Sequence, residues 1–193
     1  KGEYLFREGD CSSGFYIVNR GAIRLHKLSS GGSQQVLKTF KERESFAEST
    51  VVSLSCYPAN ACADCTTVLA RVDKLGIQRL AHSRDAIRQC LSGAIVRHLT
   101  ELVSHLEGRA FLNPESRVAK WILEEGGGVF VENPRSFEII SPKQSVADEL
   151  DMASETFSRK LRSLREKGLI NVSNKRIDIV NPVGLREIAS EER

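Results

Sequence analysis

The segment SPKQSVADELDMASETFSRKLRSLREKG, residues 141–168, decides the fold of the C-terminal part of this chain. Ser141-Pro142 is typical of a helix start, and the apolar residues that follow predict a first helix over residues 144–150. After a short break, Ser154 is the expected N-cap of a second helix over residues 155–167. Two short helices joined by a tight turn predict a helix-turn-helix motif.

The second of these helices separates apolar from positively charged side chains. Phe157, Leu161 and Leu164 share the face that we expect to be buried, whereas Arg159 and Arg162 lie on the opposite face. The first helix is acidic, so the positive charge is concentrated on the helix that would enter a DNA major groove. A charged helix face can also simply be solvated, but this concentration of charge favours DNA binding.

The sequence around this motif completes a small domain. A hairpin over residues 169–172 and 176–180 predicts a wing, so the motif becomes a winged helix-turn-helix. Upstream, residues 116–124 predict a helix, and residues 129–131 with 137–140 predict a two-stranded ribbon.

The N-terminal part, from residue 1 to about residue 75, has the pattern of a β domain. Short runs of β-branched and aromatic residues recur at intervals of roughly 8–12 residues between turn signals. This pattern predicts a small antiparallel β domain, so the whole chain is expected to be α+β. The runs are residues 4–6, 15–18, 23–25, 35–37 and 66–69.

A helical stripe follows the β pattern. Apolar residues recur every three or four positions between Ser83 and Glu107 and predict one helix of about 24 residues that stops at Gly108. Such a helix can pack on its own β domain, but the stripe is longer than a domain of this size covers. We therefore favour a parallel dimer seam. The seam residues are Leu91, Ile95, Leu99, Leu102 and Leu106.

Composition and charge disfavour several classes of protein. The 193 residues are 40% hydrophobic and 27% charged, as in an ordinary globular protein, and no apolar run is long enough to span a bilayer. Five scattered cysteines, an odd number, predict reduced thiols in the cytoplasm, and the start of the chain shows no signal-like segment. The sequence contains no phosphate loop, nucleophile elbow or paired carboxylates that indicate an enzyme.

Over nearly its whole length the chain resembles the Crp/Fnr family of bacterial transcription regulators. The most specific match is residues 154–159, SETFSR, in the second helix of the motif. Phe46-Ala47-Glu48 falls where the family has a Phe-Gly-Glu-like cassette, and residues 6–10 and 14–21 resemble the family's cyclic-nucleotide-binding-type β-roll. The resemblance implies a non-enzymatic regulator in three parts. These are a β-roll sensor domain (1–82), a long dimerisation helix with a hinge (83–112) and a winged helix-turn-helix DNA-binding domain (113–193).

The resemblance also assigns roles within the DNA-binding domain. Glu155, Ser158 and Arg159 occupy positions that contact bases in the Fnr branch, where Glu accepts from cytosine and Arg binds guanine in a bidentate fork. The Glu-x-x-Ser-Arg pattern resembles the branch that reads TTGAT-like half-sites arranged as a palindrome. Other residues are expected to contact phosphates, which supply affinity and register rather than sequence choice. They are Lys143, Gln144, Thr156, Arg162, Lys175 and Arg176.

By the same resemblance, the effector is expected in the β-roll. The pocket residues are Phe46, Ala47, Glu48, Ser49 and Asn60. Family members that bind cyclic nucleotides pair the cassette Glu with an Arg-Ser, but no arginine occurs around residues 57–61. A cyclic phosphate there would lack its bidentate partner, so cyclic AMP is disfavoured.

An iron–sulfur cluster of the Fnr type is also disfavoured. The chain as given has no N-terminal cysteine group, and Leu69 stands where the β-roll cysteine is expected. Cys62 and Cys65 form a lone Cys-x-x-Cys, but within a strand their side chains would point to opposite faces. Small buried thiols are the favoured interpretation.

The cassette and the recognition helix together look most like the branch that responds to nitrogen oxides, which is thought to use haem. Haem is therefore kept as an alternative, and the cofactor stays unassigned. The candidate axial ligands are His26, His82, His98, His105 and Met152. Met152 belongs to the DNA-binding turn, which makes it a poor ligand.

The sequence therefore predicts a cytoplasmic, homodimeric regulator that binds double-stranded DNA and, by family resemblance, RNA polymerase, without contacting a membrane. An effector, redox or gas signal in the β-roll is expected to shift the packing of two long helices and so set the spacing of the recognition helices. A haem-based sensor of nitric oxide or carbon monoxide is the alternative, and a cyclic-nucleotide-dependent regulator is less favoured.

Overall fold

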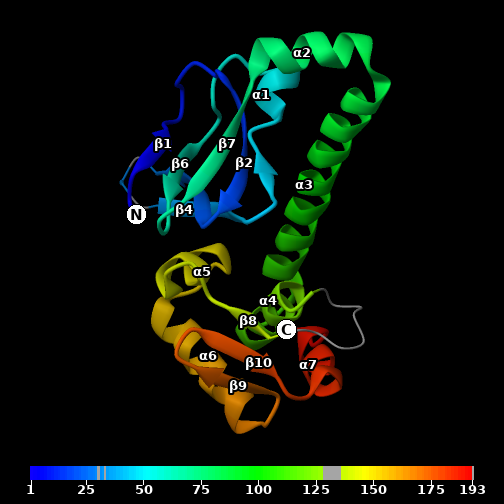
Figure 1. The fold of residues 1–193 in the computed structure, drawn as a ribbon. Helices are drawn as coiled ribbons and strands as arrows, with labels where there is room; N and C mark the ends of the chain where they lie inside the picture. The colour runs from blue at the N-terminus through cyan, green and yellow to red at the C-terminus, as the bar shows by residue number, and fades with distance from the viewer. Residues whose placement is uncertain (30, 33, 128–135, 193) are drawn as a thin grey trace. The chain divides into compact units, whose positions relative to one another are not determined.

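The computed structural model describes the whole chain except residues 30, 33, 128–135 and 193, and for residues 105 and 109 it describes only the backbone. The chain divides into two compact units, Lys1–Leu102 and Val103–Arg193, which we call the β domain and the C-terminal domain (Figure 1). Strands dominate the first unit and helices the second, which confirms the predicted α+β class. No helix in the described part is long and apolar enough to cross a membrane.

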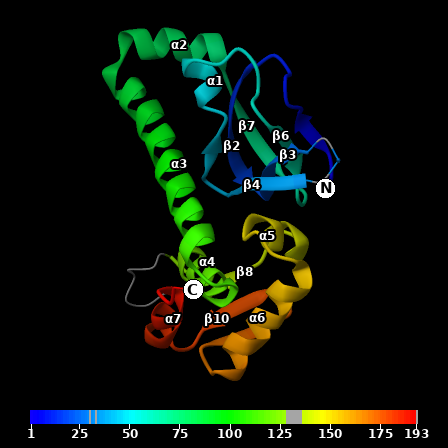
Figure 2. The same ribbon diagram turned by 180° about the vertical axis from the view of Figure 1, so that it is seen from behind.

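Two antiparallel sheets build the β domain. Their strands are β1 (Tyr4–Phe6), β2 (Gly14–Arg20), β3 (Ala22–Leu28), β4 (Gln34–Lys41), β5 (Ser45–Phe46), β6 (Asn60–Ala63) and β7 (Val68–Asp73). One sheet has the order β1-β6-β3-β4 and the other β5-β2-β7. Figures 1 and 2 show this domain from opposite sides. Gly21 makes the tight turn between β2 and β3 at a φ of +93°, where a Cβ would lie 2.6 Å from the Thr66 carbonyl oxygen.

Aromatic side chains form the core of the β domain. Phe46 is fully buried and packs on Tyr16 and Phe40, with ring centroids 5.5 and 5.3 Å apart. Tyr57 stacks on Phe6 at a centroid distance of 3.7 Å. Burying large rings removes more apolar surface from water than any other residue type, so these contacts hold the two sheets together.

One short helix lies between strands of the β domain, and two longer helices follow its last strand. They are α1 (Ser49–Val52), α2 (Lys74–Ser83) and α3 (Asp85–Phe111). The sequence pattern does not predict α2, which begins after Asp73, whose carboxylate accepts a hydrogen bond from Gly76 N. Ser83, the expected N-cap of the long helix, is the last residue of α2. The 27-residue α3 continues through Gly108, because a glycine costs a helix only about 1 kcal/mol.

The C-terminal domain contains the predicted winged helix-turn-helix. Its elements are α4 (Pro114–Glu125), β8 (Phe137–Glu138), α5 (Lys143–Glu149), α6 (Ser154–Glu166), β9 (Ile170–Ser173), β10 (Arg176–Ile179) and α7 (Pro182–Ala189). The strands form an antiparallel sheet of order β8-β10-β9. Trp121 of α4 packs edge-to-face on Phe137 and Phe157, so helices and sheet share one core.

Local helix starts in this domain differ from the prediction. Pro142 is the N-cap of α5, which leaves Ser141 one residue upstream, buried. Ala153 is the N-cap of α6, so Ser154 is the first helical residue and does not cap the helix. The predicted ribbon strand over 129–131 lies outside the described residues, and β8 pairs with β10.

Candidate nucleic-acid interface and regulatory site

The outer face of α6 carries the residues that the sequence assigns to base contact. The inner face is buried through Phe157, Leu161 and Leu164. The outer face exposes Glu155, Ser158 and Arg159, with Arg162 and Arg165 beyond them. Because the apolar residues fix the rotation of the helix on its core, these polar side chains stand side by side and face outward.

A tight turn joins α5 to α6. Asp151 takes a φ of +54°, a left-handed conformation that Asp tolerates better than most residues. Met152 N donates to Ala147 O at 3.0 Å, which closes the turn, and the Met152 side chain packs against the domain core. Met152 is therefore a structural residue of the turn.

The basic residues near α6 fall into two groups. Lys160 and Lys167 bind Glu115 of α4, with Nζ to carboxylate distances of 3.3 and 2.8 Å, and Ser163 Oγ donates to the same carboxylate at 2.8 Å. In contrast, within the described residues no ion-pair partner is found for Arg159, Arg162 or Arg165. The arginines are thus available to a ligand, whereas the two lysines hold α6 on α4.

Glu115 is mostly buried where it binds these residues. Burial raises the pKa of its carboxyl group, but the hydrogen bonds from Lys167, Ser163 and Lys160 outweigh burial and leave the pKa below its usual value. The carboxylate therefore stays charged at neutral pH and acts as a fixed anchor. Sequence analysis missed Glu115, because nothing local relates a residue of α4 to one about 50 positions downstream.

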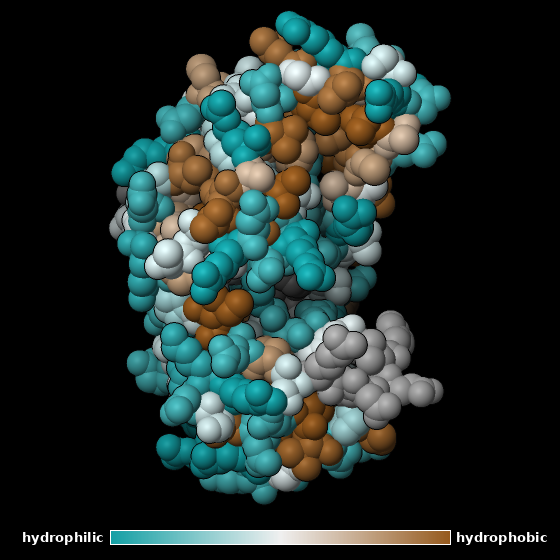
Figure 3. All heavy atoms as spheres, in the orientation of Figure 1, coloured by the Kyte–Doolittle hydropathy of each residue, from teal (hydrophilic) through white to brown (hydrophobic). Residues whose placement is uncertain are grey.

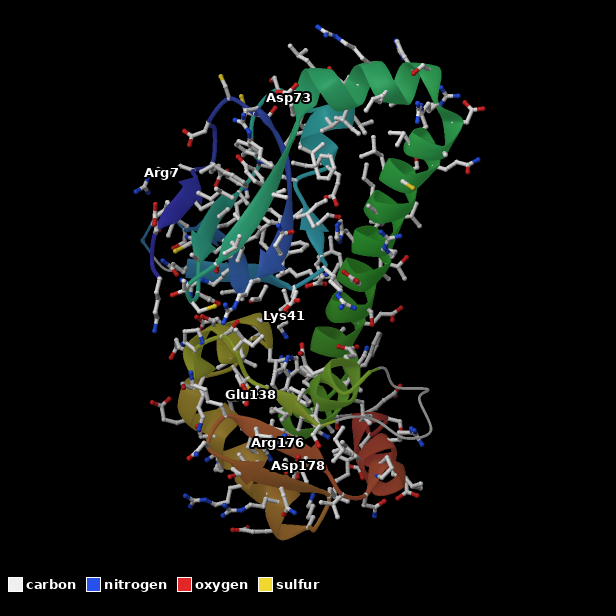
Figure 4. The ribbon with its side chains drawn as sticks, in the orientation of Figure 1. Arg7, Lys41, Asp73, Glu138, Arg176 and Asp178 are labelled. Atoms are coloured by element: carbon white, nitrogen blue, oxygen red, sulfur yellow. The ribbon has the colours of Figure 1, made fainter. Side chains whose placement is uncertain are left out.

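Two predicted phosphate-contacting residues lie at the tip of the β9–β10 hairpin. Lys175 is exposed and follows Asn174, which takes a φ of +54° in the turn. Arg176 Nε donates to Asp178 Oδ1 at 2.8 Å, and Figure 4 shows this pair close to Glu138 of β8. The hydrogen bond to Asp178 raises the pKa of Arg176. Arg176 is therefore partly neutralised by its own chain.

The remaining predicted phosphate contacts lie on the two helices of the motif. Lys143 and Gln144 are exposed in the first turn of α5, and Gln144 Nε2 donates to Asp148 Oδ1 at 2.6 Å. Thr156 is half-buried in the first turn of α6, and Arg162 is exposed nearly two turns further along. The structure thus brings the predicted DNA-contacting residues onto α5, α6 and the hairpin of one domain.

Two protein-family models match the chain in the order of these units. Residues 1–84 match a cyclic nucleotide-binding domain, and residues 116–188 match a Crp-like helix-turn-helix domain. The chain belongs to the Crp/Fnr family of transcription regulators. Members of this family are DNA-binding regulators rather than enzymes.

Named relatives extend this assignment over the whole chain. The nitrogen fixation regulation protein FixK of Rhizobium meliloti is 28% identical over 194 residues, which cover 98% of this chain and 84% of the relative. The transcriptional activator protein FnrA of Stutzerimonas stutzeri is 23% identical over 191 residues, which cover 98% and 78%. The solved structure of FixK2 from Bradyrhizobium japonicum, 22% identical, has the same fold, with a TM-score of 0.89 and coverage of 99% of this chain and 94% of that chain.

The predicted cassette Phe46-Ala47-Glu48 forms the turn from β5 into α1. Ala47 takes a φ of +69°, a left-handed conformation that costs a non-glycine residue roughly 1–2 kcal/mol. Thr50, fully buried, donates from Oγ1 to the Ala47 carbonyl at 2.7 Å and so holds the turn. Ser49 is the first residue of α1 and is half-buried. Ala47 therefore holds a backbone conformation that glycine adopts more readily.

Glu48 points its carboxylate at the long helix. It is only 2% exposed, and its Oε2 lies 3.5 Å from His98 Nε2 on α3. The ring of His98 also lies 3.6 Å from Glu101 Oε2, and Lys38 Nζ donates to that oxygen at 2.5 Å. A chain of charged side chains therefore joins the cassette to α3 and β4.

Both members of the Glu48–His98 pair are shifted toward their charged forms. The interaction with Glu48 raises the pKa of His98 despite partial burial. Burial, the largest influence, raises the pKa of Glu48, but the interactions with His98, with Ser45 and with the backbone together outweigh burial and leave the pKa below its usual value. His98 is thus an ion-pair partner of the cassette, a role that sequence analysis did not give it.

Asn60, the last predicted pocket residue, is tied to other segments. Its Oδ1 accepts from Glu8 N at 3.2 Å, and its Nδ2 donates to the carbonyl of His26 at 3.3 Å. These bonds join the start of β6 to the β1–β2 loop and to β3. They show a structural role for Asn60 and do not connect it with the cassette.

The residues of this region do not fit a cyclic nucleotide. Residues 45–70 contain no lysine, arginine or histidine, so this stretch offers no cation to a cyclic phosphate. Glu48 already faces His98, and the ring of Phe46 fills the core. No step of the regulation is therefore assigned to a cyclic nucleotide.

The histidines whose side chains the structure describes are poorly placed to bind haem. His26 is fully buried, its Nε2 lies 3.4 Å from the Tyr4 hydroxyl, and burial lowers its pKa. His98 pairs with Glu48, His82 is exposed in the last turn of α2, and the side chain of His105 is outside the described part. Among the described residues, no group of three or more His, Cys, Asp or Glu could hold a metal ion.

The lone Cys-x-x-Cys does not lie within one strand. Cys62 is buried in β6, whereas Cys65 follows two residues after the strand ends at Ala63 and is half-buried. The argument from strand alternation therefore does not apply to Cys65. Its Sγ lies 3.9 Å from Thr67 Oγ1. Leu69 packs from β7 against the aromatic core.

The long helix α3 has two apolar faces. Leu91 is only 8% exposed and packs with Phe15 and Val51, in the region where Figure 3 shows hydrophobic side chains gathered between α2, the start of α3 and the sheets. Leu91 therefore has little surface left for a partner helix, and Ile95 is half-buried. The face that stays exposed comprises Val96, Leu99, Leu102, Val103 and Leu106. Val96 and Val103 were missed because both faces are apolar in sequence.

Proposed function

We propose that this Crp/Fnr protein is a homodimeric regulator that binds a TTGAT-like palindrome and that a signal in the β domain controls its affinity for DNA. In this assignment residues 1–82 sense the signal, residues 83–112 dimerise and residues 113–193 bind DNA. It acts in the cytoplasm together with RNA polymerase. The outer face of α6 is the observation that carries the proposal.

The chemistry of that face suits base recognition. Arg159 is exposed and carries five donors in a planar fork, which matches guanine O6 and N7. Glu155, exposed one turn earlier, accepts from the amino group of cytosine. Arg162, further along α6, supports backbone contacts, since phosphate binding needs charge but no fixed orientation. We therefore assign Glu155, Ser158 and Arg159 to base contact.

Paired titrations test this assignment. Arg159→Ala is compared with Lys175→Ala on a duplex carrying the TTGAT palindrome and on one with its guanines replaced. We expect Arg159→Ala to reduce discrimination between the duplexes by about 1–3 kcal/mol per half-site. Lys175→Ala should weaken binding to both duplexes equally. It should also make the fall of log K with log[salt] less steep, by about 0.9 per lost contact. Equal loss of affinity on both duplexes for both variants contradicts the base-reading role.

The exposed face of α3 supports the dimer. Val96, Leu99, Val103 and Leu106 follow one another at intervals of three, four and three residues, the spacing of a two-stranded coiled-coil seam. Leu99 is 59% exposed. Covering this apolar side chain with a partner helix would remove it from water, which favours association. Two copies joined by a twofold axis would present two recognition helices to half-sites one helical turn apart.

The Glu48–His98 pair supports a route from the cassette to that seam. His98 lies one residue before Leu99, so a change at Glu48 acts directly on the helix that forms the dimer. The other carboxylate oxygen, Oε1, is buried without a hydrogen-bond partner in the described structure. An effector with a hydroxyl or amino donor would complete it, provided that it binds the two helix arrangements with different affinity. Thermal-shift titration with cyclic AMP tests the exclusion of a cyclic nucleotide: the melting temperature should stay unchanged, because residues 45–70 offer no cation to its phosphate.

The haem-based alternative and the nitrogen-oxide-responsive branch stay predictions. The relatives named above are of the FixK and Fnr types, and the described histidines are engaged or exposed rather than grouped. A visible absorption spectrum of the protein purified from haem-replete cells tests the alternative. A Soret band that a single histidine substitution abolishes would establish it.

A further inference from the structure

Two cysteines that are far apart in sequence are direct partners in the β domain. Cys11, in the loop between β1 and β2, and Cys56, before β6, form an isolated antiparallel bridge. Backbone hydrogen bonds flank the pair on both sides: Ser12 N donates to Ser55 O at 2.8 Å, and Tyr57 N donates to Asp10 O at 3.0 Å. The two cysteines themselves exchange no backbone hydrogen bond, so they occupy a non-hydrogen-bonded pair of an antiparallel ladder.

This position suits a disulfide. In a non-hydrogen-bonded pair the Cα atoms are about 4.5 Å apart and both side chains point to the same face of the ladder. Disulfides need Cα atoms within about 4.4–6.8 Å, so the thiols can join without movement of the backbone. Cys11 is exposed and Cys56 is half-exposed, so a small oxidant can reach the pair.

Other contacts hold the two segments together independently of the cysteines. Lys74 Nζ donates to Ser12 Oγ at 2.9 Å and to Leu54 O at 2.8 Å, so one ammonium group binds both segments. Gly9 N donates to Tyr57 O at 3.0 Å, and the Tyr57 ring is buried. The thiols are thus kept opposite each other in the reduced protein. Cys90, exposed alone on α3, has no such partner among the described residues.

We propose that Cys11 and Cys56 form a reversible redox site that reacts with low-molecular-weight disulfides. The Cys11 thiolate attacks one sulfur of the small disulfide; a mixed disulfide forms on Cys11, the original S–S bond breaks and one small thiol leaves. The Cys56 thiolate then attacks the Cys11 sulfur and expels the second small thiol, which leaves a Cys11–Cys56 disulfide. The two protein thiol protons end on the two released thiols, the protein is oxidised by two electrons and the small disulfide is reduced.

Oxidation of Cys11 and Cys56 would stabilise the β domain by joining two of its connecting segments. The new bond would cross-link two segments that the β1–β2 loop and the α1–β6 connection contribute, and cross-links stabilise chiefly by restricting the unfolded chain. Exposed disulfides are the more easily reduced and exchanged class, so a thiol reductant should reverse the reaction. The site does not depend on the proposed DNA sequence or on the effector, and it would stand if either were wrong.

Peptide mapping of the full-length protein tests the proposal. The reduced protein is incubated with oxidised glutathione, free thiols are alkylated, and trypsin is added. We expect the peptide 8–20, which contains Cys11, to be joined to the peptide 44–71, with the loss of two hydrogen atoms. Because peptide 44–71 also contains Cys62 and Cys65, tandem mass spectrometry, in which the backbone fragments readily before Pro58, shows which cysteine is bound.

Matched variants make the outcome decisive. Cys90→Ser should form the same linkage as the wild type. In Cys56→Ser, the glutathione adduct on Cys11 should persist at least about tenfold longer, because the resolving thiol otherwise acts intramolecularly at an effective concentration of about millimolar or above. Dithiothreitol should return the wild type to the reduced mass. A stable glutathione adduct on Cys11 of the wild type, or a linkage of Cys11 to Cys62 or Cys65, would overturn the proposal.

Discussion

The recognition helix and the cassette use their charged residues in opposite ways. On α6, Arg159, Arg162 and Arg165 face outward, and the described structure gives them no ion pair. In the β domain, Glu48 is buried and faces His98 of the same chain. The difference teaches that the DNA-binding function is visible in sequence because its charges are left for an external partner. The function of the cassette region is not visible in sequence, because Glu48 and His98 form an ion pair within the chain.

Breaking the dimer should have the largest effect on the outward-facing region. Leu99→Asp combined with Val103→Asp places charges in the exposed seam, and the resulting monomers should lose DNA affinity by about 10²–10⁴-fold, because the two half-sites are no longer bound together. Sedimentation velocity and gel shift measure both properties. Leu75→Asp on α2, equally exposed, is the control and should remain dimeric. Intact dimers in the double variant would disprove the seam.

Removing the anchor of α6 should have the next largest effect. Glu115→Ala deprives Lys160, Lys167 and Ser163 of their common acceptor, which we expect to destabilise the C-terminal domain by about 2 kcal/mol after allowance for solvent screening. Trp121, the only tryptophan of the chain, reports urea unfolding of this domain. Glu166→Ala, exposed at the end of α6, should change the free energy of unfolding by less than about 0.5 kcal/mol. Equal effects of the two substitutions would argue against the anchor.

Removing His98, the ion-pair partner of Glu48, should destabilise the β domain and so test the charge pairing near the cassette. His98→Gln leaves the buried Glu48 without its charged partner, and we expect a loss of about 1.5 kcal/mol in the free energy of unfolding of the β domain. All three tyrosines lie in this domain, so near-ultraviolet circular dichroism of tyrosine follows it separately from Trp121.

The effect of His98→Gln should depend on pH in a defined direction. The pKa of His98 is raised above 6.5, so its contribution is complete below that value and is lost as the pH rises through the folded-state pKa. The pKa of Glu48 is lowered below 4.5, so its contribution is complete above that value and is lost as the pH falls through the folded-state pKa. The difference between wild type and variant should thus be largest between pH 4.5 and 6.5 and smaller at pH 9. A difference that grows above pH 7 would contradict the ion pair.

Releasing Arg176 should have the smallest effect. Asp178→Asn removes the carboxylate that partly neutralises Arg176, so the guanidinium becomes free for a phosphate. We expect affinity for matched and mismatched duplexes to rise by the same few-fold factor, with the salt slope steeper by up to about 0.9. A change in sequence discrimination, or no change on either duplex, would show that the hairpin tip does not contact the DNA backbone.

Sequence reasoning succeeded where one element carries its own signal. The helix-turn-helix was predicted because α5 and α6 each bury an apolar face of their own, and the hairpin β9–β10 was predicted from its alternation and turn residues. α2 was missed because its apolar residues are half-buried or exposed and give no clear stripe. The predicted seam on α3 includes Leu91, which packs on the β domain, and leaves out the exposed Val96, because both are apolar in sequence and only packing shows which one the β domain covers.

By itself, the sequence determined the α+β class, the order of the two domains and the face of α6 that stays in solvent, because periodicity and turn residues act over a few neighbouring positions. Tertiary structure decided that Glu48 pairs with His98, that Glu115 holds Lys160 and Lys167, and that Cys11 lies opposite Cys56. These partners are 45 to 52 residues apart in sequence, and only the packing of the folded chain places them beside each other.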